Sequence, residues 1–407
     1  MRRAAWALLL LATFAIPWEN SLDFGAPFGN IARLAVFAVV LALIPAILSV
    51  GRLRTPGPLQ ALVLLLFLWF CCSCFWTIDR AETLHHLRGY LQEFIIVWLL
   101  WELVDSPRHL RDLLHAYVAG TGVLAVLTIG SFVFSPSADQ IRFVAEGQDP
   151  NDVARFLDLA FPFAALLFGS ESRWPARSLA AAYIPLGMFA VLLTASRSGF
   201  LAALISITGS AVLVFYKHRR GFILGLYALP AVLAALWITI PRQTLARLGT
   251  IPAELTRGDL NQRWDIWAAG WQAFIHAPLC GSGAGSFVAA AGVAPIDTAH
   301  NTALALLVEG GVVALLIAAV IAVHIALSLF EIKGALRIAL GSALLTWFVS
   351  SFVATVHENR ATWLLLGAVA VAARLAAEAP DEGLSAFPMR FPARPAAFVH
   401  QVTREQA

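Results

Sequence analysis

The sequence predicts an all-α fold, a polytopic transmembrane helical bundle with one long, partly helical loop outside the membrane. Of the 407 residues, 59% are hydrophobic and 13% are charged, whereas a soluble domain carries about 25% charged residues. Apolar runs of roughly 18 residues or more recur along the chain, and each can cross a hydrocarbon core of about 30 Å as a helix. These runs do not alternate with polar residues as barrel strands do.

About twelve membrane spans are expected from these runs. The first could also be a signal peptide, because Arg2 and Arg3 precede it, but its cleavage site is poor and Pro17 follows, so a retained span is favoured. The expected spans are residues 4–18, 31–50, 59–77, 90–104, 113–134, 152–170, 178–195, 199–216, 221–240, 301–330, 336–355 and 361–377.

Short basic connections predict the orientation. With the N-terminus inside, the outer connections are 19–30, 78–89, 135–151, 196–198, 241–300 and 356–360, and none of them contains lysine. The positive-inside rule then puts both termini in the cytoplasm and the loop 241–300 in the periplasm, as in a bacterial inner (cytoplasmic) membrane protein. The inner connections hold Arg2, Arg3, Arg52, Arg54, Arg108, Arg111, Arg173, Arg177, Lys217, Arg219, Arg220, Lys333 and Arg337.

The chain is expected to form one transmembrane domain, residues 1–377. Residues 378–407 are rich in alanine, proline and charge, which predicts a disordered cytoplasmic tail. The composition argues against nucleic-acid binding, since no basic tract with interleaved aromatic residues occurs. Four cysteines are too few for a disulfide framework, and no ligand spacing indicates a metal site.

Arginine dominates the outer basic residues. A guanidinium can hold phosphate oxygens bidentately, so an arginine cluster at the outer membrane surface suits a lipid-linked diphosphate. Arg247 and Arg257 are interpreted as ordinary solvated surface. The outer arginines are Arg80, Arg88, Arg142, Arg197, Arg242, Arg247, Arg257, Arg263 and Arg360.

Two of these arginines stand in distinctive surroundings. Arg197 lies in a tight turn, residues 194–199, where it must either snorkel to the headgroups or meet an anion. Arg263 lies in the first turns of an expected amphipathic helix, residues 259–274, which would lie at the membrane interface. The aromatic residues on one face of this helix are Trp264, Trp267, Trp271 and Phe274.

His300 directly precedes the apolar run that begins at Asn301. The positive end of a helix dipole lowers an imidazole pKa, so His300 is expected to be neutral and able to accept a proton. Glu309 lies deeper in the same run and must be protonated or partnered there. Asn301 and Glu309 are expected to support the site.

Three further stretches are interpreted structurally. Residues 278–287 are rich in glycine but lack the lysine of a Walker loop, so a hinge or tight reversal is favoured over a phosphate cradle. Asn151 or Asp152 is expected to cap the helix that follows. Arg155 and Asp158, three residues apart, are expected to pair.

Together these stretches resemble the O-antigen ligase and polymerase superfamily. The resemblance runs in the family's order over about residues 148–312. It rests on Asn151-Asp152 with Pro162, the turn 193–199, Arg263 in the tryptophan helix, residues 278–287, and His300-Asn301 through Glu309-Gly310-Gly311.

The resemblance implies an inverting membrane glycosyltransferase that uses no nucleotide sugar, cofactor or metal. Its two essential arginines map onto Arg197 and Arg263, which would hold the donor diphosphate, and its essential histidine maps onto His300, the base. Arg80, Arg88, Arg142 and Arg360 are additional candidates for donor binding. The implied donor is a glycan on undecaprenyl diphosphate, embedded among membrane lipids.

An O-antigen ligase, with lipid A–core oligosaccharide as acceptor, is the favoured function. A repeat-unit polymerase with the same donor is the main alternative, followed by a protein O-oligosaccharyltransferase. A transporter would place its polar residues near the membrane midplane. Here they concentrate at one surface, and the midplane charges are few: Arg155, Asp158, Glu309 and His324.

Overall fold

The computed structural model describes residues 2–25, 29–50, 53–134, 140–217, 219–258, 263–294 and 297–378. Over these ranges the chain is helical, with one isolated bridge between Asp23 and Asn30. The predicted all-α fold is confirmed. The predicted tail lies outside the described residues from 379 onward.

The helices fall into three groups along the chain. The first group is α1 (Arg2–Ala15), η1 (Ile16–Ser21), α2 (Ile31–Val50), α3 (Pro58–Cys72), η2 (Ser73–Phe75), α4 (Arg80–Leu103), α5 (Pro107–Phe134), α6 (Pro150–Ser170), α7 (Trp174–Leu193), α8 (Arg197–Lys217) and α9 (Arg219–Thr239). Four short helices follow: α10 (Arg242–Gly249), α11 (Ile251–Arg257), α12 (Arg263–His276) and α13 (Phe287–Ala291). The last group is α14 (Thr302–Glu331), α15 (Gly334–Ser351) and α16 (Arg360–Glu378).

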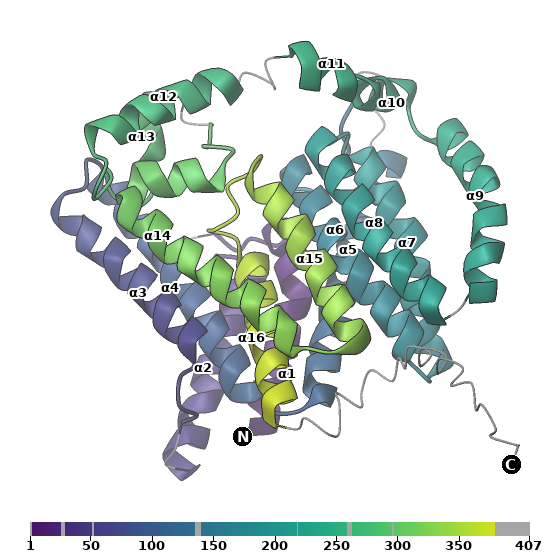
Figure 1. Ribbon diagram of the computed structural model, residues 1–407, viewed down its shortest axis with the longest axis horizontal. Coiled ribbons are helices and arrows are strands. Elements are labelled where there is room, and N and C mark those ends of the chain that lie inside the picture. The colour runs from purple at the N-terminus through teal and green to yellow at the C-terminus, as the bar shows by residue number, and fades with distance from the viewer. Residues whose placement is uncertain are drawn as a thin grey trace, which may run out of the picture.

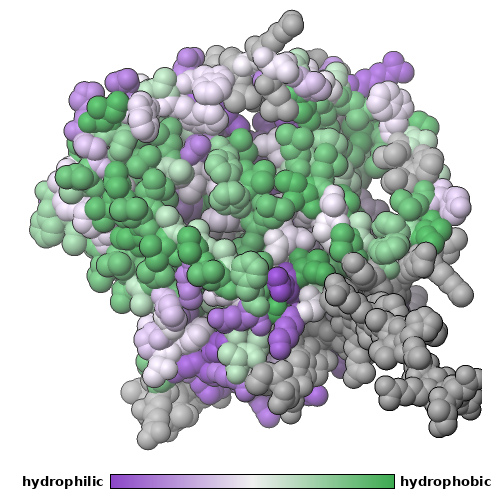
Figure 2. Space-filling view, viewed as in Figure 1, coloured by the Kyte–Doolittle hydropathy of each residue, from purple (hydrophilic) through white to green (hydrophobic). Residues whose placement is uncertain are grey.

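Eight of the described helices are long and apolar enough to cross a membrane: α3 with η2, α5, α6, α7, α8, α14, α15 and α16. The other four expected spans coincide with the helices α1, α2, α4 and α9. On the face shown in Figure 2, hydrophobic residues form a band across the middle of the molecule, and hydrophilic residues gather above and below it. The molecule is therefore a polytopic membrane protein.

The four short helices α10–α13 lie across one end of the bundle, and the N-terminus lies at the opposite end (Figure 1). Their connection from α9 to α14 is the long, partly helical loop predicted from the sequence. This end of the bundle carries the polar cavities described below.

Helix α4 begins earlier than expected. Residues 80–89, assigned to an outer connection, form its first turns. Asp79 sets this start, because its side chain accepts a hydrogen bond from the Glu82 amide (3.1 Å). Arg80 and Arg88 are consequently exposed on the surface of a helix.

Helix α6 is the most buried of the candidate spans, and most of its residues lie inside the bundle. The prediction that Asn151 or Asp152 caps this helix was wrong. Asp149 caps the helix by accepting from the amides of Asn151 (2.8 Å) and Asp152 (3.3 Å). Pro150 occupies the first turn, where its missing N–H costs nothing, and the Asn151 side chain is left free for other contacts.

The expected pair within α6 was also wrong. Arg155 Nη2 contacts Asp152 Oδ1 (2.7 Å), one turn earlier, rather than Asp158. Helical side chains lean toward the N-terminus, so Arg155 reaches backwards. Asp158 is fully buried, and neither carboxyl oxygen has a hydrogen-bond partner.

Helix α14 is broken at Gly311, whose φ of 67° and ψ of −168° are not helical. The glycine-rich stretch 278–287 forms a tight reversal, as expected, and docks against this break. The backbone of this stretch forms hydrogen bonds with N–H and C=O groups of α14 that a continuous helix would have paired within itself. The bonds are Val312 N to Pro278 O (2.9 Å), Ser282 N to Val308 O (2.8 Å) and Gly283 N to Glu309 O (2.9 Å). Trp69 Nε1 also donates to Gly310 O (2.8 Å).

We expect Gly311→Ala to destabilise the fold by several kcal/mol. A Cβ at this position would lie 2.1 Å from the Leu279 carbonyl oxygen, and the positive φ disfavours any side chain. Gly122→Ala in α5 is the control, because its Cβ would meet nothing within 4 Å. Thermal unfolding in detergent should show a lower Tm for Gly311→Ala only. Equal Tm values for the two variants would contradict this account of the break.

Candidate active site

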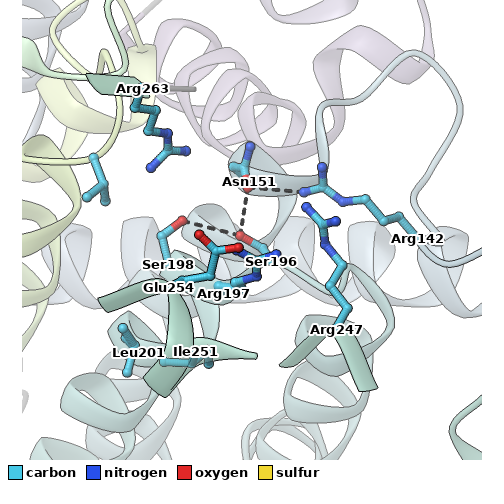
Figure 3. Close-up of a pocket in the computed structure, with 11 residues that line it drawn as sticks. Arg142, Asn151, Ser196, Arg197, Ser198, Leu201, Arg247, Ile251, Glu254 and Arg263 are labelled. Atoms are coloured by element: carbon cyan, nitrogen blue, oxygen red, sulfur yellow. Dashed lines mark hydrogen bonds and ion pairs between the residues drawn. The ribbon is translucent and has the colours of Figure 1, made fainter. Parts of the chain in front are cut away.

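Four arginines from separate segments line one cavity, which residues of α10 and α11 help to form (Figure 3). This cavity, of about 100 Å³, is here called the arginine cavity. Arg142 and Arg247 lie on one side of Asn151, and Arg263 lies on the other (Figure 3). The full lining is Arg142, Asn151, Ser196, Arg197, Ser198, Leu201, Arg247, Ile251, Glu254, Arg263 and Val353.

The turn between α7 and α8 positions Arg197 as the first residue of α8. Ala195 in this turn has a φ of 49°, a strained value for a residue other than glycine. Ser196 Oγ donates to Asn151 Oδ1 (2.8 Å), and the same oxygen accepts from Arg142 Nη2 (3.1 Å). The helix N-terminus and Arg197 therefore present positive charge to the same cavity.

Arg197 pairs with one carboxylate in the cavity. Its Nη1 lies 2.6 Å from Glu254 Oε1, and the two side chains are only 18% and 21% exposed. Arg197 Nε and Glu254 Oε2 are buried without hydrogen-bond partners. Glu254 thus occupies a position that an anionic ligand of Arg197 would take.

The electrostatics of the cavity favour an anion. Burial, followed by repulsion from neighbouring arginines, lowers the pKa of Arg142 and of Arg247. Burial also lowers the pKa of Arg263, and Asp149 opposes this shift. Among the lining residues described, Glu254 is the one carboxylate facing four guanidiniums.

A second, larger cavity of about 760 Å³ adjoins the first, and Asn151 and Val353 line both. We call it the acidic cavity. His300 lies on its wall, together with Thr298 and Ala299. Seven carboxylates line it: Asp79, Glu82, Asp149, Asp152, Asp297, Glu309 and Glu358. Carboxylates accept hydrogen bonds from hydroxyl groups, so the cavity suits a polyhydroxylated ligand.

His300 is held in a strained backbone conformation, with a φ of 44°. Burial lowers its pKa, and the nearby charge of Arg263 lowers it further, so the imidazole is neutral near pH 7. The expected neutrality is supported, although burial rather than the helix dipole is its main cause. His300 Nδ1 lies 3.2 Å from Thr298 Oγ1; a bond donated by Nδ1–H leaves Nε2 able to accept a proton.

Asn301 fixes the start of α14, and Glu309 links a later turn of the helix to the loop before it. Asn301 caps the helix by accepting from the Leu304 amide (2.9 Å), and its Nδ2 donates to Phe352 O (3.2 Å). Glu309 is 5% exposed and accepts from the Gly285 amide (3.0 Å). Glu309 therefore has a hydrogen-bond partner, which is one of the two states expected for it, the other being a protonated carboxyl group.

The tryptophan helix connects the two cavities. Its described part begins at Arg263, and residues 259–262 lie outside the described ranges. Trp267 Nε1 donates to Ala299 O (3.0 Å), which ties α12 to the residue before His300. Trp264 and Trp271 are half exposed. The helix thus positions Arg263 while part of its aromatic face stays at the surface.

The other candidate arginines do not all lie at the site. Arg142 lines the arginine cavity, whereas Arg80 and Arg88 line neither cavity. The Arg360 guanidinium is engaged elsewhere, by Glu19 Oε2 (2.6 Å) and Gln92 Oε1 (2.5 Å).

Two residues of the arginine cavity were missed. The interpretation of Arg247 as solvated surface was wrong, because it lines the cavity and its Nε donates to Ala195 O (3.3 Å). The side chain of Arg257 is outside the described part. Glu254 was not singled out, because one glutamate in a polar loop carries no local signal of its partner.

Fold and site together define a helical membrane protein with partly buried groups that can bind an anion and accept a proton. Residues 181–319 match a family model described as O-antigen ligase. The match includes Arg197, Arg263 and His300, and it confirms the resemblance to the O-antigen ligase and polymerase superfamily. It supports a membrane glycosyltransferase of the ligase or polymerase type. A search of curated proteins found no match.

We expect Glu254→Gln to increase the affinity of the arginine cavity for pyrophosphate about two- to fivefold. A pair between partly exposed groups is worth up to about 1 kcal/mol, and the neutral amide competes less well for Arg197. Pyrophosphate binding can be measured by calorimetry on the purified protein in nanodiscs. Glu331→Gln, far along α14, is the control and should bind as the wild type does. Weaker binding by Glu254→Gln would contradict this role.

Proposed function

We propose that the protein is an O-antigen ligase that transfers a glycan from undecaprenyl diphosphate to a hydroxyl of lipid A–core oligosaccharide. The observation that carries the proposal is the adjacency of two cavities. Arg197 and Arg263 line one, His300 lines the other, and Asn151 and Val353 form a shared wall. An anionic leaving group and a proton acceptor can thus serve one reaction centre.

The donor diphosphate would bind in the arginine cavity. Negative charge grows on the diphosphate as the glycosidic bond breaks, and preorganised guanidiniums stabilise that charge. Arg197 and Arg263 would carry this role, with Arg142 and Arg247 alongside them. Glu254 must release Arg197 when the diphosphate enters. The polyprenyl chain would remain among the membrane-spanning helices and lipids.

The acceptor would enter the acidic cavity. Its hydroxyl is a poor nucleophile, and neutral His300 would remove the proton as general base. The acceptor oxygen then bonds to the anomeric carbon while the bond to the diphosphate oxygen breaks, and the proton ends on the imidazole. Attack from the face opposite the leaving group inverts the anomeric centre. The guanidiniums offset the diphosphate charge, so this step requires neither a metal nor a cofactor.

The reaction would take place at the periplasmic face of the inner membrane. The lysine-free outer connections support this orientation. So does the position of the N-terminus at the end of the bundle opposite α10–α13 (Figure 1). A repeat-unit polymerase is the alternative, because the same donor site would serve an acceptor that is itself lipid-linked.

Reconstitution with undecaprenyl-diphosphate glycan and purified lipid A–core tests the proposal. Arg197→Ala, Arg263→Ala and His300→Ala should each reduce transfer by about 10²–10³-fold or more, because each removes charge stabilisation or proton transfer in the transition state. Arg242→Ala is the matched control, since Arg242 is an exposed arginine in the same loop, and it should retain full activity.

Wild-type transfer by any of the three variants would remove that residue from the mechanism. If glycan is extended on undecaprenyl diphosphate but never reaches lipid A–core, the protein is a polymerase. Transfer to neither acceptor by the wild-type protein would contradict both functions.

The pH dependence of glycan transfer should reflect the protonation of His300. Because burial and Arg263 lower its pKa, the neutral base persists to lower pH, and the acid limb of kcat/KM should fall below the ordinary histidine value of about 6.5. Above that limb the rate should be flat through neutrality. Residual activity of His300→Gln should lack the limb. An acid limb at or above pH 6.5 would contradict a neutral His300.

A further inference from the structure

A second cluster of polar side chains lies at the wall of the acidic cavity, apart from the four arginines. It combines Glu309 of α14 with His357 and Glu358, which precede α16. One ligand-capable atom from each side chain lies within 4.8 Å of the other two. One imidazole and two carboxylates are a donor set for a divalent cation.

His357 supplies a separate observation. It is 5% exposed, and neither ring nitrogen has a hydrogen-bond partner. Buried polar side chains are nearly always hydrogen bonded, so an unpartnered imidazole requires an explanation. Its ring stacks on Tyr90, with centroids 6.1 Å apart, which holds the nitrogens in a fixed orientation. A nitrogen facing two carboxylates is arranged as a metal ligand is.

The charges around the cluster need compensation. His86 Nδ1 bonds Glu358 Oε1 (2.6 Å), and Glu93 Oε2 is buried without a partner. The carboxylates of Glu93, Glu309 and Glu358 share the neighbourhood with two cations that are already engaged. His86 is paired with Glu358, and Arg360, near Glu93, is paired with Glu19. Buried negative charges are costly unless a cation offsets them.

We propose that Glu309, His357 and Glu358 bind a structural Zn²⁺ ion. An imidazole nitrogen beside two carboxylate oxygens suits Zn²⁺, whereas Mg²⁺ prefers an all-oxygen shell. His86 orients the Glu358 carboxylate from outside the ligand set. Standard ligand spacing does not reveal the site, because Glu309 comes from a different helix.

The ion joins two segments that already contact each other. Thr302 Oγ1 donates to Ala354 O (2.8 Å), and the Val356 amide donates to Thr302 Oγ1 (3.0 Å). Zn²⁺ between Glu309 and the pair His357 and Glu358 adds a second link, deeper along α14. It clamps the segment 352–359 against α14, whose first turn follows His300. The ion is structural and touches neither Arg197 nor Arg263.

Metal content and thermal stability of the full-length protein in detergent test the proposal. We expect one Zn²⁺ per chain by mass spectrometry after dialysis against Zn²⁺ and removal of excess metal, and a Tm that rises with Zn²⁺ and not with Mg²⁺. His357→Gln and Glu358→Gln should bind Zn²⁺ at least tenfold more weakly and lose the Zn²⁺-dependent rise in Tm. His85→Gln, which changes an exposed histidine on α4, is the matched control and should bind as the wild type does.

Folding of the variants is checked separately, in the presence of chelator. There, both variants should melt within a few degrees of chelator-treated wild type, so that a lost Zn²⁺ response reports the site and not unfolding. Wild-type protein that takes up no Zn²⁺, or variants that bind it with unchanged affinity, would overturn the proposal. The test uses no glycan transfer, so its failure leaves the proposed ligase function untouched, and failure of the ligase function leaves the site untouched.

Discussion

The break in α14 at Gly311 is the constraint on which the site depends. A helix in a membrane satisfies its own backbone, and an interruption is tolerated only where other groups replace the lost bonds. Here the backbone of residues 278–283 and the indole of Trp69 replace them. The docked loop in turn reaches Glu309 through the Gly285 amide. One glycine therefore fixes the loop, the depth of Glu309 and the floor of the acidic cavity together.

The two cavities differ sharply in charge although they share a wall. The arginine cavity gathers four guanidiniums, and the acidic cavity gathers seven carboxylates. In the described part of the chain, the non-glycine residues with positive φ are Ala195 and His300, one at each cavity. Backbone strain of this kind costs about 1–3 kcal/mol per residue and persists where surrounding packing overdetermines it. The turn before α8 and the start of α14 are held in this way.

Much of the fold followed from local patterns. Apolar run length predicted the helices. The family resemblance, rather than any local pattern, suggested that Arg197, Arg263 and His300 serve one site, and they line two adjoining cavities. Two of the failures were nonlocal. Arg247 was misassigned because its position over the turn before α8 depends on how α10 packs. Glu254 was missed because no sequence pattern around it indicates that it pairs with Arg197. The cap of α6 was misplaced for a local reason, because Pro150 shifts the first helical position and leaves Asp149 as the cap.

The ion pair between Arg197 and Glu254 has a consequence for selectivity. Any anion that binds Arg197 must first displace the carboxylate, and this exchange lowers the net gain for a small ion from solution. A headgroup anchored in the bilayer does not diffuse away, so its local concentration at the cavity is far higher than that of a dissolved competitor. The internal carboxylate would thus weaken the binding of free inorganic phosphate, while a membrane-tethered anion offsets that loss through its higher local concentration.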